Sequence, residues 1–96
     1  MGFNKEFIDR YVKYQDSARE DIARLEKEIP RFNQIHQAIY LFLKISAHRG
    51  KPTRGSLYLY STRKQRDAPA LEVYYTFDSE NVTIYNICVA EEFESD

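Results

Sequence analysis

The sequence predicts an α+β domain in which an antiparallel helical hairpin packs on one face of a three-stranded antiparallel sheet. This prediction rests on two patterns of apolar residues. They recur every three or four positions up to residue 49, as in helices, and at every second position from residue 56 onward, as in strands. The chain has 96 residues, of which 43% are hydrophobic, which suits one core and a single domain over 1–96. The predicted order of elements is therefore helix, helix, strand, strand, strand.

A first helix is expected over residues 4–28. Its apolar residues form one stripe at steps of three and four, which comprises Phe7, Tyr11, Tyr14, Ala18, Ile22, Leu25 and Ile29. Asn4 is a suitable N-cap, and Pro30 ends the segment. A straight helix of this length spans about 37 Å, which is longer than a compact domain of this size. We expect it either to overhang the domain, as a dimerisation or partner surface, or to break near Asp16.

A second helix is expected over residues 31–49. Its apolar stripe comprises Phe32, Ile35, Ile39, Phe42, Leu43 and Ser46, and it ends before Gly50. His48 and Arg49 fall in the last turn, where cations interact favourably with the helix dipole. The short link at Pro30 predicts that the two helices run antiparallel.

Three strands are expected over residues 56–62, 70–77 and 81–89. The residues predicted to face the helices are Leu57, Leu59, Leu71, Val73, Val82 and Ile84. The residues predicted to point away are Tyr58, Tyr60, Glu72, Tyr74, Thr83 and Tyr85. Residues 78–81 have turn chemistry and predict a hairpin. Asn86 interrupts the alternation, so we expect a bulge there that turns Ile87 and Val89 toward the helices.

Two helices cover only one face of such a sheet, so the other face is expected to stay open. Its predicted tyrosines are Tyr58, Tyr60, Tyr74 and Tyr85. Tyrosine combines apolar contact with a polar tip, which suits a protein interface or the stacking of nucleobases. Tyrosine also favours strands and pairs across them, which explains the same pattern without a partner.

The net charge of −1 conceals a strong partition along the chain. Every charged residue within 32–66 is basic, and these residues are Lys44, Arg49, Lys51, Arg54, Arg63, Lys64 and Arg66. Every charged residue within 67–96 is acidic, and residues 90–96 form an acidic tail with Glu91, Glu92, Glu94 and Asp96. The partition predicts a cationic surface for an anionic partner, an acidic surface for a cationic partner, or two surfaces that neutralise each other within the fold.

Three alternating segments follow the two predicted helices: Gly55–Ser61, Leu71–Phe77 and Asn81–Ile87. In their order and patterning they resemble the RelE/ParE toxin superfamily, in which a helical hairpin packs on an antiparallel sheet. The resemblance implies a protein of a toxin–antitoxin module. RelE-like members cleave mRNA on the ribosome, ParE-like members poison gyrase, and an antitoxin wraps the toxin. The chain differs from the family at three points: members usually begin with a strand before the helices, carry an arginine where Glu72 stands, and end near basic or aromatic residues.

The first functional hypothesis is binding to RNA or the ribosome through the basic loops beside the first strand and through the tyrosines. Its binding residues are Arg49, Lys51, Arg54, Tyr58, Tyr60, Arg63, Lys64, Arg66, Tyr74 and Tyr85. If the chain also cleaves RNA, His48 with Tyr58 or Tyr60 is the candidate acid–base pair. The alternative is a small non-enzymatic inhibitor or immunity-type protein, bacterial or phage, that blocks a protein partner with its tyrosine face and with the acidic residues Glu72, Glu91, Glu92, Glu94 and Asp96.

No cofactor or metal site is expected. His36 and His48 lie far apart in the chain, and no acidic residue between 32 and 66 completes a metal site. The single cysteine, Cys88, excludes an intramolecular disulfide, which predicts a reducing, cytoplasmic location and a buried, inert thiol. The longest apolar run, 38–43, is far shorter than the roughly 20 residues that cross a bilayer, so no membrane partner is expected. A domain with so small a core can gain stability by association, so we expect a protein partner, and a homodimer is an alternative.

Overall fold

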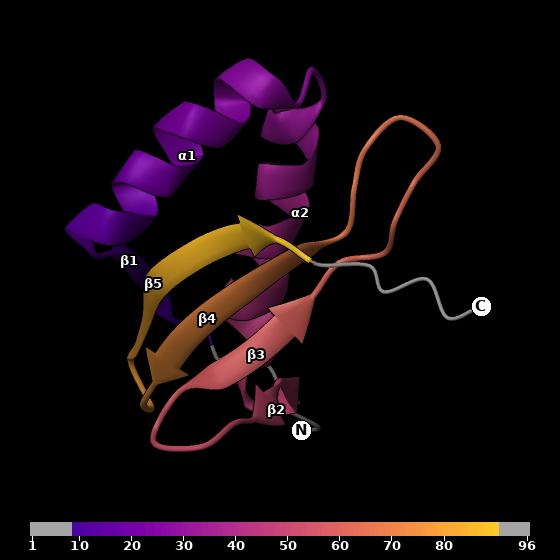
Figure 1. Cartoon of the computed structure of the whole chain (residues 1–96). Coiled ribbons are helices and arrows are strands. Elements are labelled where there is room, and N and C mark those ends of the chain that lie inside the picture. Colours follow the sequence, from indigo (N-terminus) through magenta and orange to yellow (C-terminus); the bar gives the residue numbers. More distant parts are fainter. Residues whose placement is uncertain (1–8, 91–96) are drawn as a thin grey trace, which may run out of the picture.

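The computed structural model describes residues 9–90, which form two helices and a five-stranded sheet (Figure 1). The elements in chain order are β1 (Tyr11–Tyr14), α1 (Asp16–Glu28), α2 (Phe32–Ser46), the 3-10 helix η1 (Ala47–Arg49), β2 (Lys51–Pro52), β3 (Tyr58–Ser61), β4 (Leu71–Phe77) and β5 (Asn81–Val89). The strand order is β1-β5-β4-β3-β2, with β1 parallel to β5 and the other pairs antiparallel. The α+β class is confirmed, whereas the prediction of a purely antiparallel, three-stranded sheet is wrong.

β1 occupies a segment that the sequence assigned to the first helix. Val12 and Tyr14 pack against the core, while Tyr11 is exposed, so the four residues alternate as a strand. The segment forms a strand rather than a helix because the backbone N–H and C=O groups along the edge of β5 need hydrogen-bond partners. The Tyr11 N–H donates to the Glu80 carbonyl oxygen (2.8 Å), and the Gln15 N–H donates to the Ile84 carbonyl oxygen (2.9 Å).

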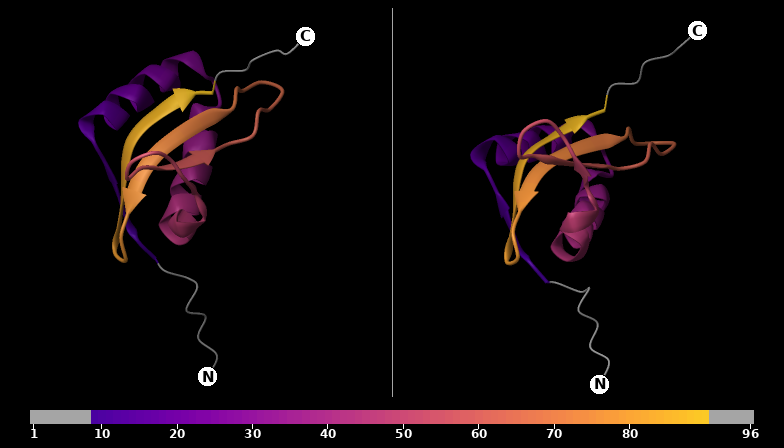
Figure 2. Two further views of the ribbon diagram at one scale, coloured as in Figure 1. Left: turned by 60° about the horizontal axis from the view of Figure 1, so that its bottom comes forward. Right: turned by 90° about the horizontal axis from the view of Figure 1, so that it is seen from below.

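α1 therefore begins at Asp16, at the break that the sequence offered as one alternative. Beyond the end of β1, α1 takes over along the edge of β5 (Figures 1 and 2). The Ser17 hydroxyl donates to the Tyr85 carbonyl oxygen (2.6 Å), and the Ile87 N–H donates to Asp21 Oδ2 (2.9 Å). Two polar side chains of a helix thus satisfy backbone groups that a further strand would have paired. The predicted N-cap Asn4 and the stripe residue Phe7 lie outside the described residues.

The core lies between the two helices and one face of the sheet (Figure 2). Its largest fully buried side chains are Phe32, Leu25, Ile39 and Leu43 from the helices and Tyr75, Leu71, Ile84, Ile87, Val73 and Val82 from β4 and β5. The alternation of these two strands, the stripe of the second helix and the part of the first stripe from Ala18 onward are confirmed, whereas Tyr11 and Tyr14 of the first stripe belong to β1. The other face of the sheet carries no described helix (Figure 1).

β3 is turned the opposite way from the prediction. Tyr58 pairs with Tyr75, and Tyr60 pairs with Val73. Directly opposed residues of an antiparallel pair point to the same face, and both partners are buried, so Tyr58 and Tyr60 face the helices. Leu59, which was predicted to face the helices, lies on the open face instead.

Aromatic contacts explain this orientation of β3. The Tyr60 ring stacks on Phe42 of α2 with 4.1 Å between centroids and 11° between planes. The Tyr58 ring lies edge-on to Phe77 at 4.9 Å. A run of alternating leucine and tyrosine is apolar on both faces, and these ring pairs, which lie far apart in the sequence, select the tyrosine face for the core.

The predicted bulge in the last strand is confirmed, because the pairing of β4 with β5 shifts register next to Asn86 and leaves Tyr85 as the extra residue. Ile87 is buried as expected. Val89 pairs with the buried Leu71 and so lies on the face of the helices as predicted, but at the end of the sheet 43% of its surface is exposed. The hairpin before the bulge is also confirmed, since the Asp78 carboxylate accepts the N–H groups of the turn, which lowers the pKa of Asp78.

Arg10 is the one buried charged side chain among the described residues, with 4% of its surface exposed. Its Nε donates to the Asp78 carbonyl oxygen (2.7 Å), and its guanidinium lies 5.1 Å from the centroid of the Phe77 ring. Its backbone N–H donates to the Lys44 carbonyl oxygen (2.9 Å). Arg10 therefore ties the start of β1 to the β4–β5 turn and to the end of α2.

Candidate functional site

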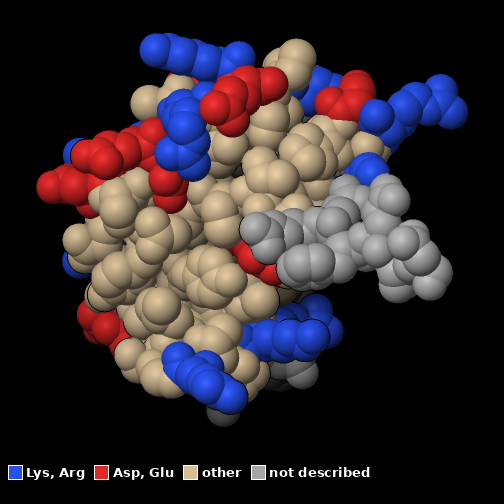
Figure 3. Space-filling view, viewed as in Figure 1, with Lys and Arg blue, Asp and Glu red and all other residues tan. Residues whose placement is uncertain are grey.

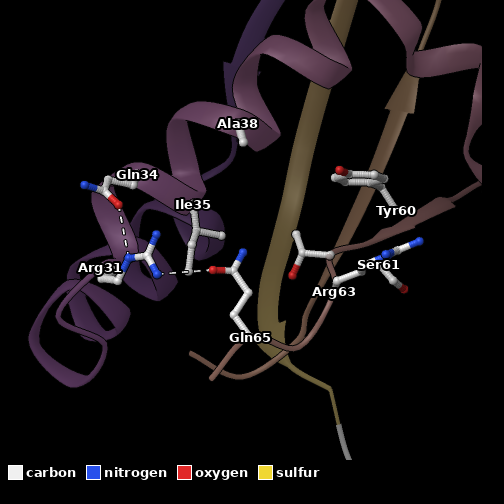
Figure 4. A pocket seen from close by; sticks show the side chains of 9 residues that line it. Arg31, Gln34, Ile35, Ala38, Tyr60, Ser61, Arg63 and Gln65 are labelled. Atoms are coloured by element: carbon white, nitrogen blue, oxygen red, sulfur yellow. Dashed lines mark hydrogen bonds between the residues drawn. The ribbon is translucent and has the colours of Figure 1, made fainter. Parts of the chain in front are cut away.

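A cavity of about 420 Å³ lies between the first half of α2 and the chain that leaves β3 (Figure 4). We call it the arginine cavity. Its lining residues are Arg31, Gln34, Ile35 and Ala38 on the side of α2, and Tyr60, Ser61, Thr62, Arg63 and Gln65 on the side of β3. Its volume falls within the range of about 300–1,000 Å³ that is typical of ligand pockets.

Arg31 is held at one wall of the arginine cavity by three side chains. Its Nε donates to Gln34 Oε1 (3.1 Å), and its Nη1 donates to Gln65 Oε1 (3.3 Å) and to Asp67 Oδ1 (3.0 Å). Figure 4 shows the guanidinium between the two glutamines. The pair with Asp67 is exposed to solvent and stabilises the fold little, so its main effect is to orient Arg31.

Tyr60 and Arg63 form the opposite wall (Figure 4). Phe42 covers one face of the Tyr60 ring, so the ring is backed by a second aromatic side chain. The chain is fixed at this point because the Thr62 N–H donates to the Leu71 carbonyl oxygen (2.9 Å), and the Leu71 N–H donates to Thr62 Oγ1 (2.8 Å). The end of β3 thus places Tyr60 and Arg63 on the same side of the cavity.

The groups that line the arginine cavity suit a nucleotide. The guanidinium group of Arg31 provides donors that fit a phosphate bidentately, and the exposed Arg63 adds a second cation on the other side. The backed ring of Tyr60 offers a surface on which a base can stack. The amides of Gln34 and Gln65 provide both donors and acceptors for the edge of a base. No acidic side chain lines this cavity.

The structure separates the predicted basic residues into two groups. Arg63, Lys64 and Arg66 lie in the loop after β3, beside the arginine cavity, whereas Arg49 and Lys51 lie in η1 and β2, on the free side of β3, and Arg54 lies in the loop before β3 (Figure 1). Figure 3 shows basic side chains at the upper right and at the bottom of the molecule, with acidic atoms visible between them. None of Arg49, Lys51 and Arg54 lines the arginine cavity, so the two groups do not form one site.

Of the four tyrosines predicted on the open face, Tyr74 and Tyr85 belong to strand faces turned away from the core and are half-buried. Tyr58 and Tyr60 do not lie there, as the register of β3 shows. The Tyr74 hydroxyl donates to Glu72 Oε1 (3.3 Å), and burial together with that carboxylate raises the pKa of Tyr74.

The acidic surface has one described member, Glu72, on the open face. Glu91, Glu92, Glu94 and Asp96 lie outside the described residues.

The candidate acid–base pair does not form. His48 is exposed in η1. Tyr58 packs among the rings of Tyr75 and Phe77. Within residues 9–90, no hydrogen bond or ring contact joins His48 to Tyr58 or Tyr60, because His48 ends the second helical segment whereas both tyrosines point into the core.

A second cavity, of about 350 Å³, lies on the other side of α2, and sequence reasoning did not find it. We call it the histidine cavity. Its lining residues are Tyr14, Asn33, His36, Gln37 and Tyr40. A signal for it exists in the sequence, because positions 33, 36, 37 and 40 share one helix face. Tyr14 was not recognised as part of this cavity because the sequence analysis assigned it to the first helix.

A hydrogen bond of 2.8 Å joins the Tyr14 hydroxyl to His36 Nε2. Burial lowers the pKa of His36, and the nearby Glu26 carboxylate opposes this effect. Burial also raises the pKa of Tyr14, with a smaller contribution from Tyr40. Both side chains are therefore uncharged at neutral pH. Among residues 9–90, no three His, Cys, Asp or Glu side chains lie close enough to hold a metal ion.

No family model, curated protein or solved structure matches this chain. Within the described part of the chain, no helix is long and apolar enough to cross a membrane.

Proposed function

We propose that this protein binds single-stranded RNA through the arginine cavity and that it is a RelE/ParE-like member of a toxin–antitoxin module. The observation that carries the RNA proposal is the wall formed by Tyr60 and Arg63, with Arg31 opposite, in a cavity of about 420 Å³. Aromatic rings that stack bases, beside cations that contact the backbone, are the usual elements of single-strand recognition.

The second group of basic residues extends the proposed path of the RNA. Lys51 of β2 pairs with Leu59, the residue before Tyr60 of the cavity wall, and Arg49 and Arg54 flank β2, so the second group borders β3 along a span that a few nucleotides of extended RNA cover. An RNA strand that leaves the cavity along β3 meets these cations. RNA is favoured over the inhibitor hypothesis because the described cavity is lined by arginine and by no acidic residue.

The position of β1 supports the proposed RelE/ParE relationship. Family members usually begin with a strand before the helices, and such a strand was missing from the sequence interpretation. β1 precedes both helices and pairs in parallel with β5. Glu72 still stands where the family carries an arginine, and His48 is not joined to a tyrosine, so the proposal is binding rather than cleavage of RNA.

The binding experiment measures fluorescence anisotropy of a labelled single-stranded RNA with the wild type and with Arg63→Ala. Arg63→Ala is expected to weaken binding and to reduce the slope of log affinity against log salt by about 1, because one phosphate contact is lost. Arg19→Ala is the matched control, since Arg19 is an exposed arginine on α1. Equal affinities and equal slopes for the two variants would refute the assignment of the cavity.

Tyr60 tests the stacking part of the proposal. Tyr60→Leu is expected to weaken RNA binding by about 5- to 150-fold, the range measured for loss of one base–aromatic stack. Tyr60→Phe keeps the ring over Phe42 and is expected to bind like the wild type. Because Tyr60→Leu also removes a ring contact of the core, circular dichroism must show that each variant is folded. If Tyr60→Phe weakened RNA binding while Tyr60→Leu did not, the result would contradict stacking of a base on this ring.

The toxin part of the proposal is tested separately, by expression in a bacterial host with and without the neighbouring gene. We expect growth arrest by the wild type and its relief by the neighbouring gene. Arg63→Ala is expected to reduce the arrest, because the target is reached through the arginine cavity. Normal growth at full expression of the wild type would contradict the toxin proposal and leave the RNA-binding measurement unaffected.

A further inference from the structure

We propose that the histidine cavity binds an uncharged nucleobase of the adenine type, either in a free nucleoside or in an RNA strand. This cavity is separate from the arginine cavity, since the two lie on opposite sides of α2 and share no lining residue. It combines aromatic rings with two amides and contains no charged side chain.

The aromatic part of the histidine cavity is built as a fixed wall. Tyr14 lies edge-on to His36, with 5.6 Å between the ring centroids and a hydrogen bond of 2.8 Å between them. On its other side, His36 stacks on the buried ring of Phe32 at 5.6 Å and 27°. His36 is therefore held from two directions, by β1 and by the core. A wall that is already ordered loses little conformational freedom when a planar ligand binds to it.

The amides of the histidine cavity come from Asn33 and Gln37, one helical turn apart on α2. Both are exposed, so neither is committed to the core. An amide side chain offers one acceptor and two donors and matches the N6 and N7 atoms of adenine bidentately. Together with the rings, these groups provide the stacking and the edge contacts by which proteins recognise unpaired bases.

The charge around the histidine cavity argues against an anionic ligand. Lys44 lies beside this cavity, with its Nζ 5.8 Å from the centroid of the Tyr40 ring. Lys44 is already paired with Asp9, at 3.1 Å from Oδ1. No lysine or arginine lines this cavity, so a phosphate there would lack a charged partner among the lining residues, whereas a neutral base needs none. The volume of about 350 Å³ is sufficient for a base, with the sugar directed to solvent.

The experiment is a titration of the ¹⁵N-labelled protein with adenosine, followed by NMR. Adenosine carries no phosphate, so its binding does not depend on the arginines of the other cavity. We expect saturable shifts in residues 33–40 and at Tyr14, with an affinity that is insensitive to salt. We expect Gln37→Ala to weaken binding about tenfold, because one amide contact to the base is lost. Gln34→Ala is the matched control on the same helix and is expected to leave the affinity for adenosine unchanged.

Three results would overturn the proposal: no saturable shift with adenosine, shifts confined to the arginine cavity, or equal affinities of Gln37→Ala and the wild type. A second measurement distinguishes the source of the base, by comparing the affinities of adenine-rich and uracil-rich RNA for the wild type and Gln37→Ala. If Gln37→Ala loses affinity for the adenine-rich RNA but not for the uracil-rich RNA, the site binds a base of the RNA. Unchanged RNA binding, with adenosine still bound by the wild type, assigns it to a free nucleoside.

Discussion

Replacing Tyr75 by phenylalanine removes one buried hydrogen bond and leaves the packing of the core in place. The Tyr75 side chain is fully buried, and its hydroxyl donates to the Ala47 carbonyl oxygen at 2.6 Å. In Tyr75→Phe this carbonyl keeps only the longer hydrogen bond from the Gly50 N–H (3.3 Å), so the loss of one hydrogen bond costs about 0.5–1.5 kcal/mol of the free energy of unfolding. For a domain of this size, each kcal/mol corresponds to a shift in Tm of about 4–8 °C.

Urea unfolding followed by circular dichroism measures this loss. Tyr74→Phe is the matched control, because Tyr74 precedes Tyr75 but lies on the open face, where its hydroxyl donates to Glu72 over 3.3 Å. We expect the control to change the free energy of unfolding by less than about 0.5 kcal/mol. If Tyr75→Phe were as stable as Tyr74→Phe, the hydrogen bond would not anchor η1 to the sheet.

The same pair of proteins has a predicted dependence on pH. Burial raises the pKa of Tyr75 from 10.0 to about 12 in the folded protein. Above pH 10 the unfolded chain releases this proton while the folded chain keeps it. The stability that the neutral hydroxyl contributes is therefore complete below pH 10 and is lost as the pH rises toward 12. The difference between the wild type and Tyr75→Phe should shrink over this interval, and a constant difference would contradict the raised pKa.

Three further predictions concern other parts of the fold. Asp21→Ala leaves the Ile87 N–H without its acceptor and should cost about 1–3 kcal/mol of the free energy of unfolding in urea, whereas Asp21→Asn keeps an acceptor and should cost less. Gly50→Ala should destabilise the protein by several degrees in Tm, because a Cβ there would overlap the Tyr75 hydroxyl and lie 2.8 Å from its Cζ. The NMR titration of His36 should give a pKa below 6.5, so the stability that its neutral ring contributes is present above pH 6.5 and lost as the pH falls further.

The strands of the hairpin were predictable because their signals are local. Alternation fixed the inward residues of β4 and β5, and Asn86 marked the bulge. The direction of β3 was not predictable, since leucine and tyrosine are both apolar and only the distant ring of Phe42 selects the tyrosine side. β1 was missed for a similar reason: Tyr11–Tyr14 fits a helical stripe until the unpaired edge of β5 is present to bind it.

The candidate site was predicted in part. Tyr60 and Arg63 were named from their residue types and do lie together, but in a cavity beside α2 rather than on the open face. Arg31 was missed because it stands beside a proline between the helices, in a part of the sequence with balanced charge. The pairing of Tyr14 with His36 joins a strand to a helix and has no signal that a sequence alone could supply.

The most direct test of the proposed RNA site is a map of the residues that respond to RNA. A short single-stranded RNA is added to the ¹⁵N-labelled protein, and the shifted backbone amides are assigned by NMR. Binding through the arginine cavity predicts that the largest shifts lie in residues 31–38 and 60–66. Shifts centred on the open face around Tyr74, or an unchanged spectrum at saturating RNA, would contradict it.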